Sequence, residues 1–224
     1  WYGVQRFYEF HLTIPGEIDV MGAGQQGQPF VNIGFNKDVA WSHTVSTAKR
    51  FTLYQLQLVP GDFLKYQYTN EAGEVEQRDI TKEDITIDLP GGATHTGTIY
   101  SSHFGPMLAA NFVNGALPPW GGFNLAFAIR DAASENPRGI NQWFSMNKAT
   151  ISEDLLDRMT TVLGLPFVNT IAADRDGNAL YADMSTVPHV TGAQFAACVG
   201  ANPALQALAA AGIPGLDGST AACE

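Results

Sequence analysis

The chain has 224 residues, of which 45% are hydrophobic and 15% are charged, and its formal net charge at pH 7 is −10. This composition supports a sizeable folded core, in one large domain or two small ones, and excludes a disordered chain. The negative charge disfavours a nucleic-acid or anionic-membrane partner, and no apolar run is long enough to cross a bilayer as a helix.

Alternating apolar residues predict a series of short strands, separated by Gly- and Pro-containing turns. The expected strands are residues 6–15, 31–35, 39–47, 51–59, 63–68, 75–78, 85–89, 94–100 and 123–129. The Gly- and Gln-rich segment 22–29 is expected to form a flexible loop. Its Gly22-Ala23-Gly24 stretch is too short a signal for phosphate binding.

Two later segments have the periodicity of helices. Residues 136–146 place apolar side chains at helical spacing, with Pro137 in the expected first turn. Residues 152–163 open on Ser152 as the expected N-cap, continue with two acidic residues, and end before Gly164.

A last pair of strands is predicted over residues 167–173 and 179–184, joined by an Asp-Gly turn. Strands come first, two helices follow, and strands return, with no internal repeat. This order predicts an α+β fold with a mainly antiparallel sheet.

The two cysteines, Cys198 and Cys223, lie near the end of the sequence without metal-ligand spacing. They are expected to form a disulfide that closes a Gly-, Pro- and Ala-rich segment, which would contribute about 3–4 kcal/mol by the chain-entropy estimate. Two free buried thiols are the alternative. A disulfide would indicate an oxidising compartment.

Familiar catalytic motifs do not occur: the sequence has no Gly-x-Ser-x-Gly, His-Glu-x-x-His, P-loop or dinucleotide fingerprint. The five histidines are scattered, so no metal site is expected. His43 stands between Ser42 and Thr44, but neighbours on a strand point to opposite faces, which argues against a Ser–His dyad. Trp143 and Phe167 are compatible with an apolar ligand pocket or with an ordinary core.

Several blocks of sequence, in order along the whole chain, resemble the penicillin acylase family, and most closely its acyl-homoserine-lactone and aculeacin acylases. The blocks are RFYEFHLTIPG at residues 6–16, VNIGFN at 31–36, AWSHTV at 40–45, SSHFGP at 101–106, QWFSMN at 142–147 and VNTIAAD at 168–174. The resemblance implies an N-terminal-nucleophile hydrolase with an αββα sandwich. Its precursor is cleaved into an α-subunit, a spacer and a β-subunit.

In this family the N-terminal Ser of the β-subunit attacks an amide carbonyl, and its own α-amine is the base. That amine has a pKa near 8 and accepts a proton near neutral pH. Trp1 resembles a residue that follows the nucleophile, and the downstream oxyanion Asn is not matched. Residues 1–224 are therefore expected to be the central part of a β-subunit, inactive alone.

Specific residues match the family's site. The backbone N–H of Val45 corresponds to an oxyanion donor. The positions that correspond to the acyl-binding site are Phe7, Asn32, Ile33, Trp143, Phe167 and Val168. Gln5, Gln25 and Gln28 fall where long-chain acylases tend to be apolar.

The resemblance also implies the surroundings of this site. The expected partners are the α-subunit of the same precursor and a small N-acyl substrate (an acyl-homoserine lactone, a lipopeptide or a β-lactam), with neither nucleic acid nor membrane. The expected location is periplasmic or extracellular. No cofactor or metal is expected, and residues 46–49 do not support the structural calcium of some members. A non-catalytic acyl-binding module is the alternative function.

Overall fold

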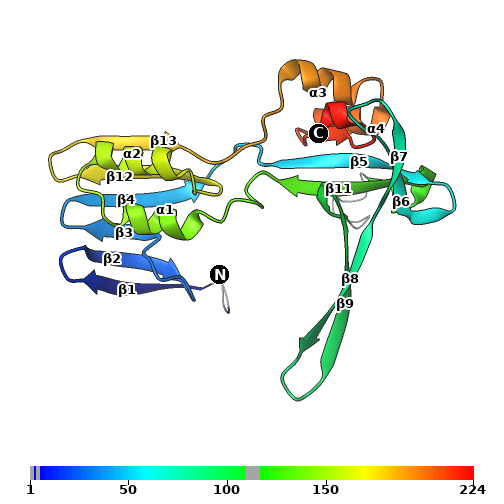
Figure 1. Ribbon diagram of the computed structural model, residues 1–224. Coiled ribbons are helices and arrows are strands. Elements are labelled where there is room, and N and C mark those ends of the chain that lie inside the picture. Colours follow the sequence, from blue (N-terminus) through cyan, green and yellow to red (C-terminus); the bar gives the residue numbers. More distant parts are fainter. Residues whose placement is uncertain (1–2, 4–5, 109–116) are drawn as a thin grey trace. The chain divides into compact units, whose positions relative to one another are not determined.

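The computed structural model describes residue 3, residues 6–108 and residues 117–224 of the chain. Trp1 and Gln5 lie outside these residues, so the expected place of Trp1 after the nucleophile stays a prediction. The chain divides into two compact units. Unit 1 comprises Trp1–Arg50 and Ala133–Val187, and unit 2 comprises Phe51–Ala132 and Pro188–Glu224 (Figure 1).

Unit 1 is built on a six-stranded antiparallel sheet of order β1-β2-β3-β4-β12-β13. Its strands are β1 (Phe7–Ile14), β2 (Ile18–Gln25), β3 (Ile33–Asn36), β4 (Val39–Val45), β12 (Val168–Asp174) and β13 (Ala179–Asp183). In β4, Val39 and Trp41 are buried while Ala40 and Ser42 are exposed. This period of two gives the sheet one core-facing and one outward face.

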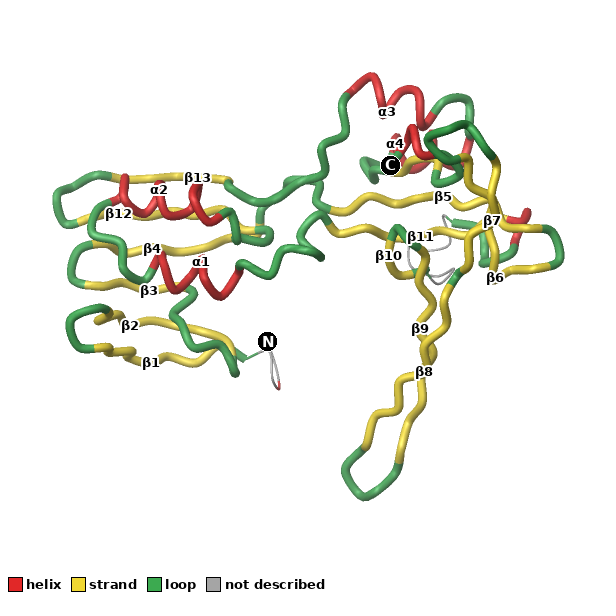
Figure 2. Tube along the Cα trace, viewed as in Figure 1, coloured by secondary structure: helices red, strands yellow, loops and turns green. Residues whose placement is uncertain are grey.

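Two helices, α1 (Gly139–Met146) and α2 (Ser152–Val162), cover the core-facing side of this sheet (Figure 2). Their buried residues Met146, Leu155 and Met159 pack with Trp41 and Ala172 of the sheet in one hydrophobic core. Unit 1 therefore contributes one helical layer and one sheet layer. The predicted α+β class with antiparallel strands is confirmed.

The outward face of the sheet carries large apolar side chains. Met21, Phe35, Ile171 and Tyr181 are exposed there, and their cross-strand pairing places them on the side opposite the helices. Exposed apolar residues grouped in this way mark a surface that another layer of protein would cover.

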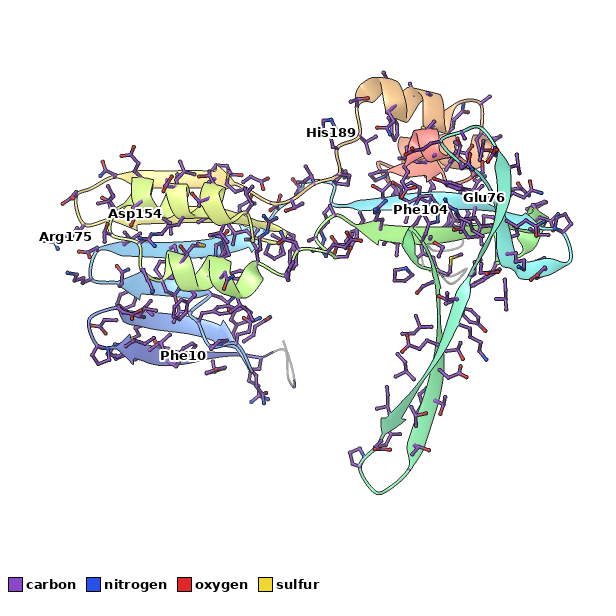
Figure 3. All side chains as sticks on the ribbon, viewed as in Figure 1. Phe10, Glu76, Phe104, Asp154, Arg175 and His189 are labelled. Carbon is purple, nitrogen blue, oxygen red and sulfur yellow. A yellow bond between two sulfur atoms is a disulfide. The ribbon has the colours of Figure 1, made fainter. Side chains whose placement is uncertain are left out.

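Unit 2 holds a five-stranded sheet of order β11-β5-β6-β7, in which a further strand pairs in parallel with β5. The strands are β5 (Phe51–Val59), β6 (Asp62–Thr69), β7 (Val75–Asp79), β11 (Leu125–Asp131) and β14 (Gly215–Asp217). Aromatic side chains fill its core. Phe104, labelled in Figure 3, stacks on Tyr54 with ring centroids 3.9 Å apart.

A three-stranded sheet extends from unit 2, formed by β8 (Thr81–Asp88), β9 (Thr94–Ser102) and the short β10 (Gly105–Pro106). Near the chain's end lie α3 (Gly192–Val199), α4 (Pro203–Ala210) and the 3-10 turn η3 (Ala221–Cys223). The structure contains the expected disulfide between Cys198 and Cys223, and both residues are buried.

The prediction of a flexible loop over residues 22–29 is wrong at its start, because β2 continues to Gln25. Gly22 pairs with both Phe10 and Gly34. A Cβ added at Gly22 would lie 2.2 Å from the carbonyl oxygen of Ile33, so this glycine permits a close approach of two strands.

Helix starts and several strand starts also differ from the prediction: β3 begins at Ile33, β8 at Thr81 and β11 at Leu125, where residues 31, 85 and 123 were expected. α1 begins at Gly139, so Pro137 precedes the helix. Ser152 is the first residue of α2 and not its cap; its N–H donates to the Asp174 carboxylate at 2.9 Å instead. Phe123 lies in the 3-10 turn η2 (Gly122–Asn124) with a positive φ, because the chain turns there before β11 begins.

The helices α3 and α4 were absent from the prediction, since Ala- and Gly-rich sequence shows little amphipathic periodicity. Each has a side-chain cap: Thr191 accepts the N–H of Gln194, and Asn202 accepts the N–H of Ala204. These caps are a local signal by which the helices could have been predicted.

Candidate functional site

The candidate site residues on strands of unit 1 gather at one end of its sheet. Because the strands alternate in direction, the start of β1, the end of β2, the start of β3, the end of β4 and the start of β12 coincide there (Figure 1). Phe7, Ile33, Val45 and Val168 occupy these strand ends. The antiparallel order thus assembles residues that are far apart in the sequence.

Val45 is the last residue of β4, and 71% of its surface is exposed. It pairs with Val168, while the next N–H, that of Ser46, donates to the carbonyl of Phe167 at 2.9 Å. Backbone groups of successive residues point to opposite edges of a strand. The N–H of Val45 therefore points away from β12, toward the edge of β4 that faces β3. On that edge Ala40 and Trp41 pair with β3, and Val45 lies past them toward the end of the strand.

Trp143 of α1 is tied to the sheet through His43. The indole N–H donates to Nε2 of His43 at 3.2 Å, and Nδ1 of His43 lies 3.3 Å from the carbonyl oxygen of Asn169. Burial lowers the pKa of His43 to about 4, opposed in part by the bond to Asn169. The imidazole is neutral at physiological pH.

The same indole lines a groove of about 310 Å³ at the N-terminal end of α1. It stacks on the ring of Phe30, with ring centroids 5.4 Å apart and planes 1° from parallel. Pro29, Pro137 and Ile140 add apolar surface to the lining, and Gln28 and Asn136 each add an amide. The arrangement suits a mostly apolar ligand group with limited hydrogen bonding.

Asn32 is buried and connects neighbouring strands. Its Oδ1 accepts the N–H of Gln25 at 3.3 Å, and its carbonyl accepts the indole N–H of Trp41 at 2.8 Å. Gln25 in turn pairs with Phe7 across β1 and β2, and Ile33 follows Asn32 as the first residue of β3. Asn32 thereby fixes the loop that leads into β3.

Phe167 precedes β12 and is 37% exposed. The guanidinium carbon of Arg50 lies 4.0 Å from the centre of its ring, a cation–π contact. Val168 packs against the hydrophobic core of unit 1. The groove beside Trp143 is lined by neither Phe167 nor Val45.

Sequence reasoning missed the contacts that His43 makes with Trp143 and β12. The alternation argument against a Ser–His dyad agrees with these contacts. The ring bonds to Trp143, Asn169 and Thr170, while Ser42 lies on the outward face. His43 stands two residues before Val45 and so faces the same side of the sheet. The spacing of two residues between His43 and Val45 was the sequence signal that could have predicted a place for His43 near the site.

Within the described residues, no group of three or more His, Cys, Asp or Glu side chains is arranged to hold a metal ion. Among the described helices, none is long and apolar enough to span a membrane.

Comparison with solved structures identifies the fold. Penicillin G acylase from Alcaligenes faecalis superposes with a TM-score of 0.66 over 98% of this chain and 34% of that chain, at 21% sequence identity. The chain thus shares its α+β fold, with antiparallel sheets, with penicillin G acylase.

Sequence comparison gives the family. A family model described as penicillin amidase matches residues 1–224, and the chain belongs to this family. Acyl-homoserine lactone acylase PvdQ of Pseudomonas fluorescens Pf-5 is 40% identical over 100% of this chain and 27% of that protein. Aculeacin-A acylase of Actinoplanes utahensis is 39% identical with the same coverages. The chain thus spans about a quarter of the length of these relatives.

Proposed function

We propose that residues 1–224 are the central part of the β-subunit of an acylase that hydrolyses the amide bond of N-acyl compounds. Family membership supports the reaction class. The observation that carries the assignment is the end of the unit 1 sheet, where Val45 and Val168 are paired across β4 and β12, with Phe7 at the same end of the sheet on β1. The nucleophile in this proposal is an N-terminal Ser outside these residues.

The proposed reaction is an acyl transfer to that Ser. Its hydroxyl oxygen attacks the amide carbonyl while the α-amine takes the hydroxyl proton, and the carbonyl oxygen becomes an oxyanion. The N–H of Val45 donates a hydrogen bond to this oxyanion. Collapse of the intermediate breaks the C–N bond, the protonated amine returns its proton to the leaving group, and water then hydrolyses the acyl-enzyme.

The acyl chain is proposed to lie among Phe7, Asn32, Ile33, Trp143, Phe167 and Val168. The placement of Phe7, Ile33 and Val168 at one end of the sheet supports this, as does the groove beside Trp143. The names of the relatives suggest an acyl-homoserine lactone or a lipopeptide as substrate, with a β-lactam as a further candidate.

The proposed partner is an α-subunit from the same precursor, and the proposed location is periplasmic or extracellular. The buried disulfide between Cys198 and Cys223 supports an oxidising compartment. The apolar outward face of the unit 1 sheet supports a further layer of the fold contributed by other parts of the enzyme.

Expression of the full-length precursor tests this function. The processed enzyme should release a carboxylic acid from an N-acyl-homoserine lactone, an aculeacin-type lipopeptide or penicillin G, and residues 1–224 alone should release none. Binding of the acyl compounds without hydrolysis by the processed protein would favour the acyl-binding module. A processed protein that neither binds nor hydrolyses these compounds would refute both the acylase and the acyl-binding module.

A further inference from the structure

One imidazole joins three elements of unit 1. His43 on β4 accepts the indole N–H of Trp143 from α1 at 3.2 Å. Its Nδ1 lies 3.3 Å from the carbonyl oxygen of Asn169 and 3.1 Å from the hydroxyl oxygen of Thr170, both on β12. A rotation of the ring would break contacts to a helix and to a second strand together.

The partners of His43 determine its tautomer. An indole N–H can only donate and a backbone carbonyl can only accept. Nε2 must therefore lack a proton, and Nδ1 must carry one. A protonated ring would point an N–H at the indole N–H, so the contact to Trp143 requires neutral imidazole.

The side chain held by this contact is a wall of the groove. Trp143 lies against Phe30 in a parallel stack and lines the groove with Ile140 and Pro29. Trp143 is also buried in the hydrophobic core of unit 1, whose apolar contacts have little directional preference. The hydrogen bond to His43 is directional and orients the N–H edge of the ring beside the groove.

We propose that His43 is a positioning residue for the acyl site: it holds the indole of Trp143 in one place and so sets which acyl chains fit. The inference rests on the proposed acylase function for the class of its ligand. His43 and Val45 are two residues apart on the same face of β4. A single strand therefore carries both the proposed oxyanion donor and the group that fixes the wall of the groove.

Substitution of His43 distinguishes a positioning role from a purely structural one. Its loss lowers stability and leaves the choice between acyl chains unchanged, whereas loss of a positioning residue changes that choice in a folded enzyme. The informative quantity is the ratio of kcat/KM for hexanoyl- and decanoyl-homoserine lactone.

The main test uses the processed full-length enzyme with His43→Leu and His43→Gln. We expect His43→Leu to change the ratio about tenfold, mostly through KM, because small changes in an apolar site discriminate chains by that order. His43→Gln should restore the ratio to within about threefold, since its amide oxygen can accept the indole N–H. His95→Gln, on the exposed β9 strand, is the matched control.

Trp143→Phe keeps an aromatic ring but removes the donor, and it gives a second route if His43→Leu does not fold. It should change the ratio in the same direction as His43→Leu. The double variant should add little, because both changes break one interaction. An unchanged ratio in folded single variants overturns the proposal while leaving the acylase function intact.

A readout without activity tests the contact itself. In the processed full-length enzyme labelled with ¹⁵N-tryptophan, the indole N–H of Trp143 should be protected from exchange with water, and His43→Leu should remove this protection. Rapid exchange in the unsubstituted chain overturns the proposal. Failure of the unsubstituted enzyme to hydrolyse either substrate refutes the proposed function, and the acyl-site role of His43 with it.

Discussion

Val45 and Val168 face each other across the β4–β12 pair, next to the bond in which the N–H of Ser46 donates to the carbonyl of Phe167. The proposed oxyanion donor and a proposed acyl-site residue are thus direct cross-strand neighbours. Side chains at such paired positions lie about 5 Å apart. We therefore expect a substitution at the start of β12 to affect the position where the scissile carbonyl is proposed to lie.

Substitution of Val45 separates its backbone role from its side-chain role. In the processed enzyme, Val45→Pro deletes the N–H and should lower kcat by about 10²–10³, the usual loss for one oxyanion donor. Val45→Ala keeps the N–H and should retain kcat within a few-fold, because the side chain is exposed. Kinetics with N-acyl-homoserine lactone, with circular dichroism as the folding check, measure both.

Equal losses of kcat in two folded variants would contradict the oxyanion role of Val45. The residue would then contribute to packing at the end of β4. A loss confined to Val45→Pro in an enzyme that still binds substrate supports the role.

The stability of unit 1 should depend on pH through His43. Its pKa is lowered in the folded state from 6.5 to about 4, so between these values the unfolded chain binds a proton that the folded chain does not. The free energy of unfolding therefore falls as the pH decreases from about 6.5 to 4, by at most about 3 kcal/mol from this group.

Urea unfolding of residues 1–224 at several pH values in this range measures the effect. His43→Gln has no titrating side chain at this position, so its stability should fall less steeply as the medium is acidified. Parallel pH profiles for the two proteins would mean that His43 is not kept neutral by the fold.

Asp174 should stabilise unit 1 as an acceptor for backbone donors. Its carboxylate accepts the N–H of Ser152 at 2.9 Å, of Asp176 at 3.1 Å and of Asn178 at 3.0 Å. These bonds hold the pKa of Asp174 well below its usual range. They join the start of α2 to the β12–β13 turn.

Asp174→Ala leaves these donors without their acceptor and should lower the free energy of unfolding by about 1–3 kcal/mol. The matched control is Asp157→Ala, an exposed aspartate on α2, which should change it by less than about 0.5 kcal/mol. Urea unfolding of both variants provides the comparison. Similar values for the two would remove the argument for Asp174.

The disulfide between Cys198 and Cys223 should stabilise unit 2. The cysteines are 25 residues apart, and closing a loop of this length contributes about 3–4 kcal/mol in the chain-entropy model. A Cys198→Ser, Cys223→Ser double variant should lose about this much by urea unfolding. Mass spectrometry of the native protein under non-reducing conditions should find no alkylatable thiol, and two such thiols would contradict the bond.

The strands that the sequence predicts best are those with a strong local pattern. Phe51–Val59 agrees with its predicted bounds because alternating large residues are followed by a Pro-Gly turn. Gly22 lies in a strand for a reason that its own segment does not contain, namely its pairing with β1 on one side and the close approach of β3 on the other. Glycines carry no periodicity, and their neighbours decide their conformation.

In the candidate site, too, some features follow from local sequence and others depend on contacts between distant residues. The position of Val45 at a strand end follows from the local pattern of β4 together with the family resemblance. The contact between His43 and Trp143 joins residues 100 positions apart, and no local pattern reports that they meet. Only the pairing of β4 with β12 and the packing of α1 over them make that contact visible.

Substitution of Phe167 should change the choice of acyl chain more than the fold. The ring is 37% exposed and lies under Arg50, so Phe167→Trp can be accommodated without overpacking a closed core. In the processed enzyme we expect the kcat/KM ratio for hexanoyl- over decanoyl-homoserine lactone to shift by about tenfold, since the larger ring removes room for the longer chain. Phe123→Trp, on an 88% exposed turn of unit 2, is the matched control and should leave the ratio unchanged. Equal ratios for both variants and the unsubstituted enzyme, with unaltered circular dichroism, would place Phe167 outside the acyl site.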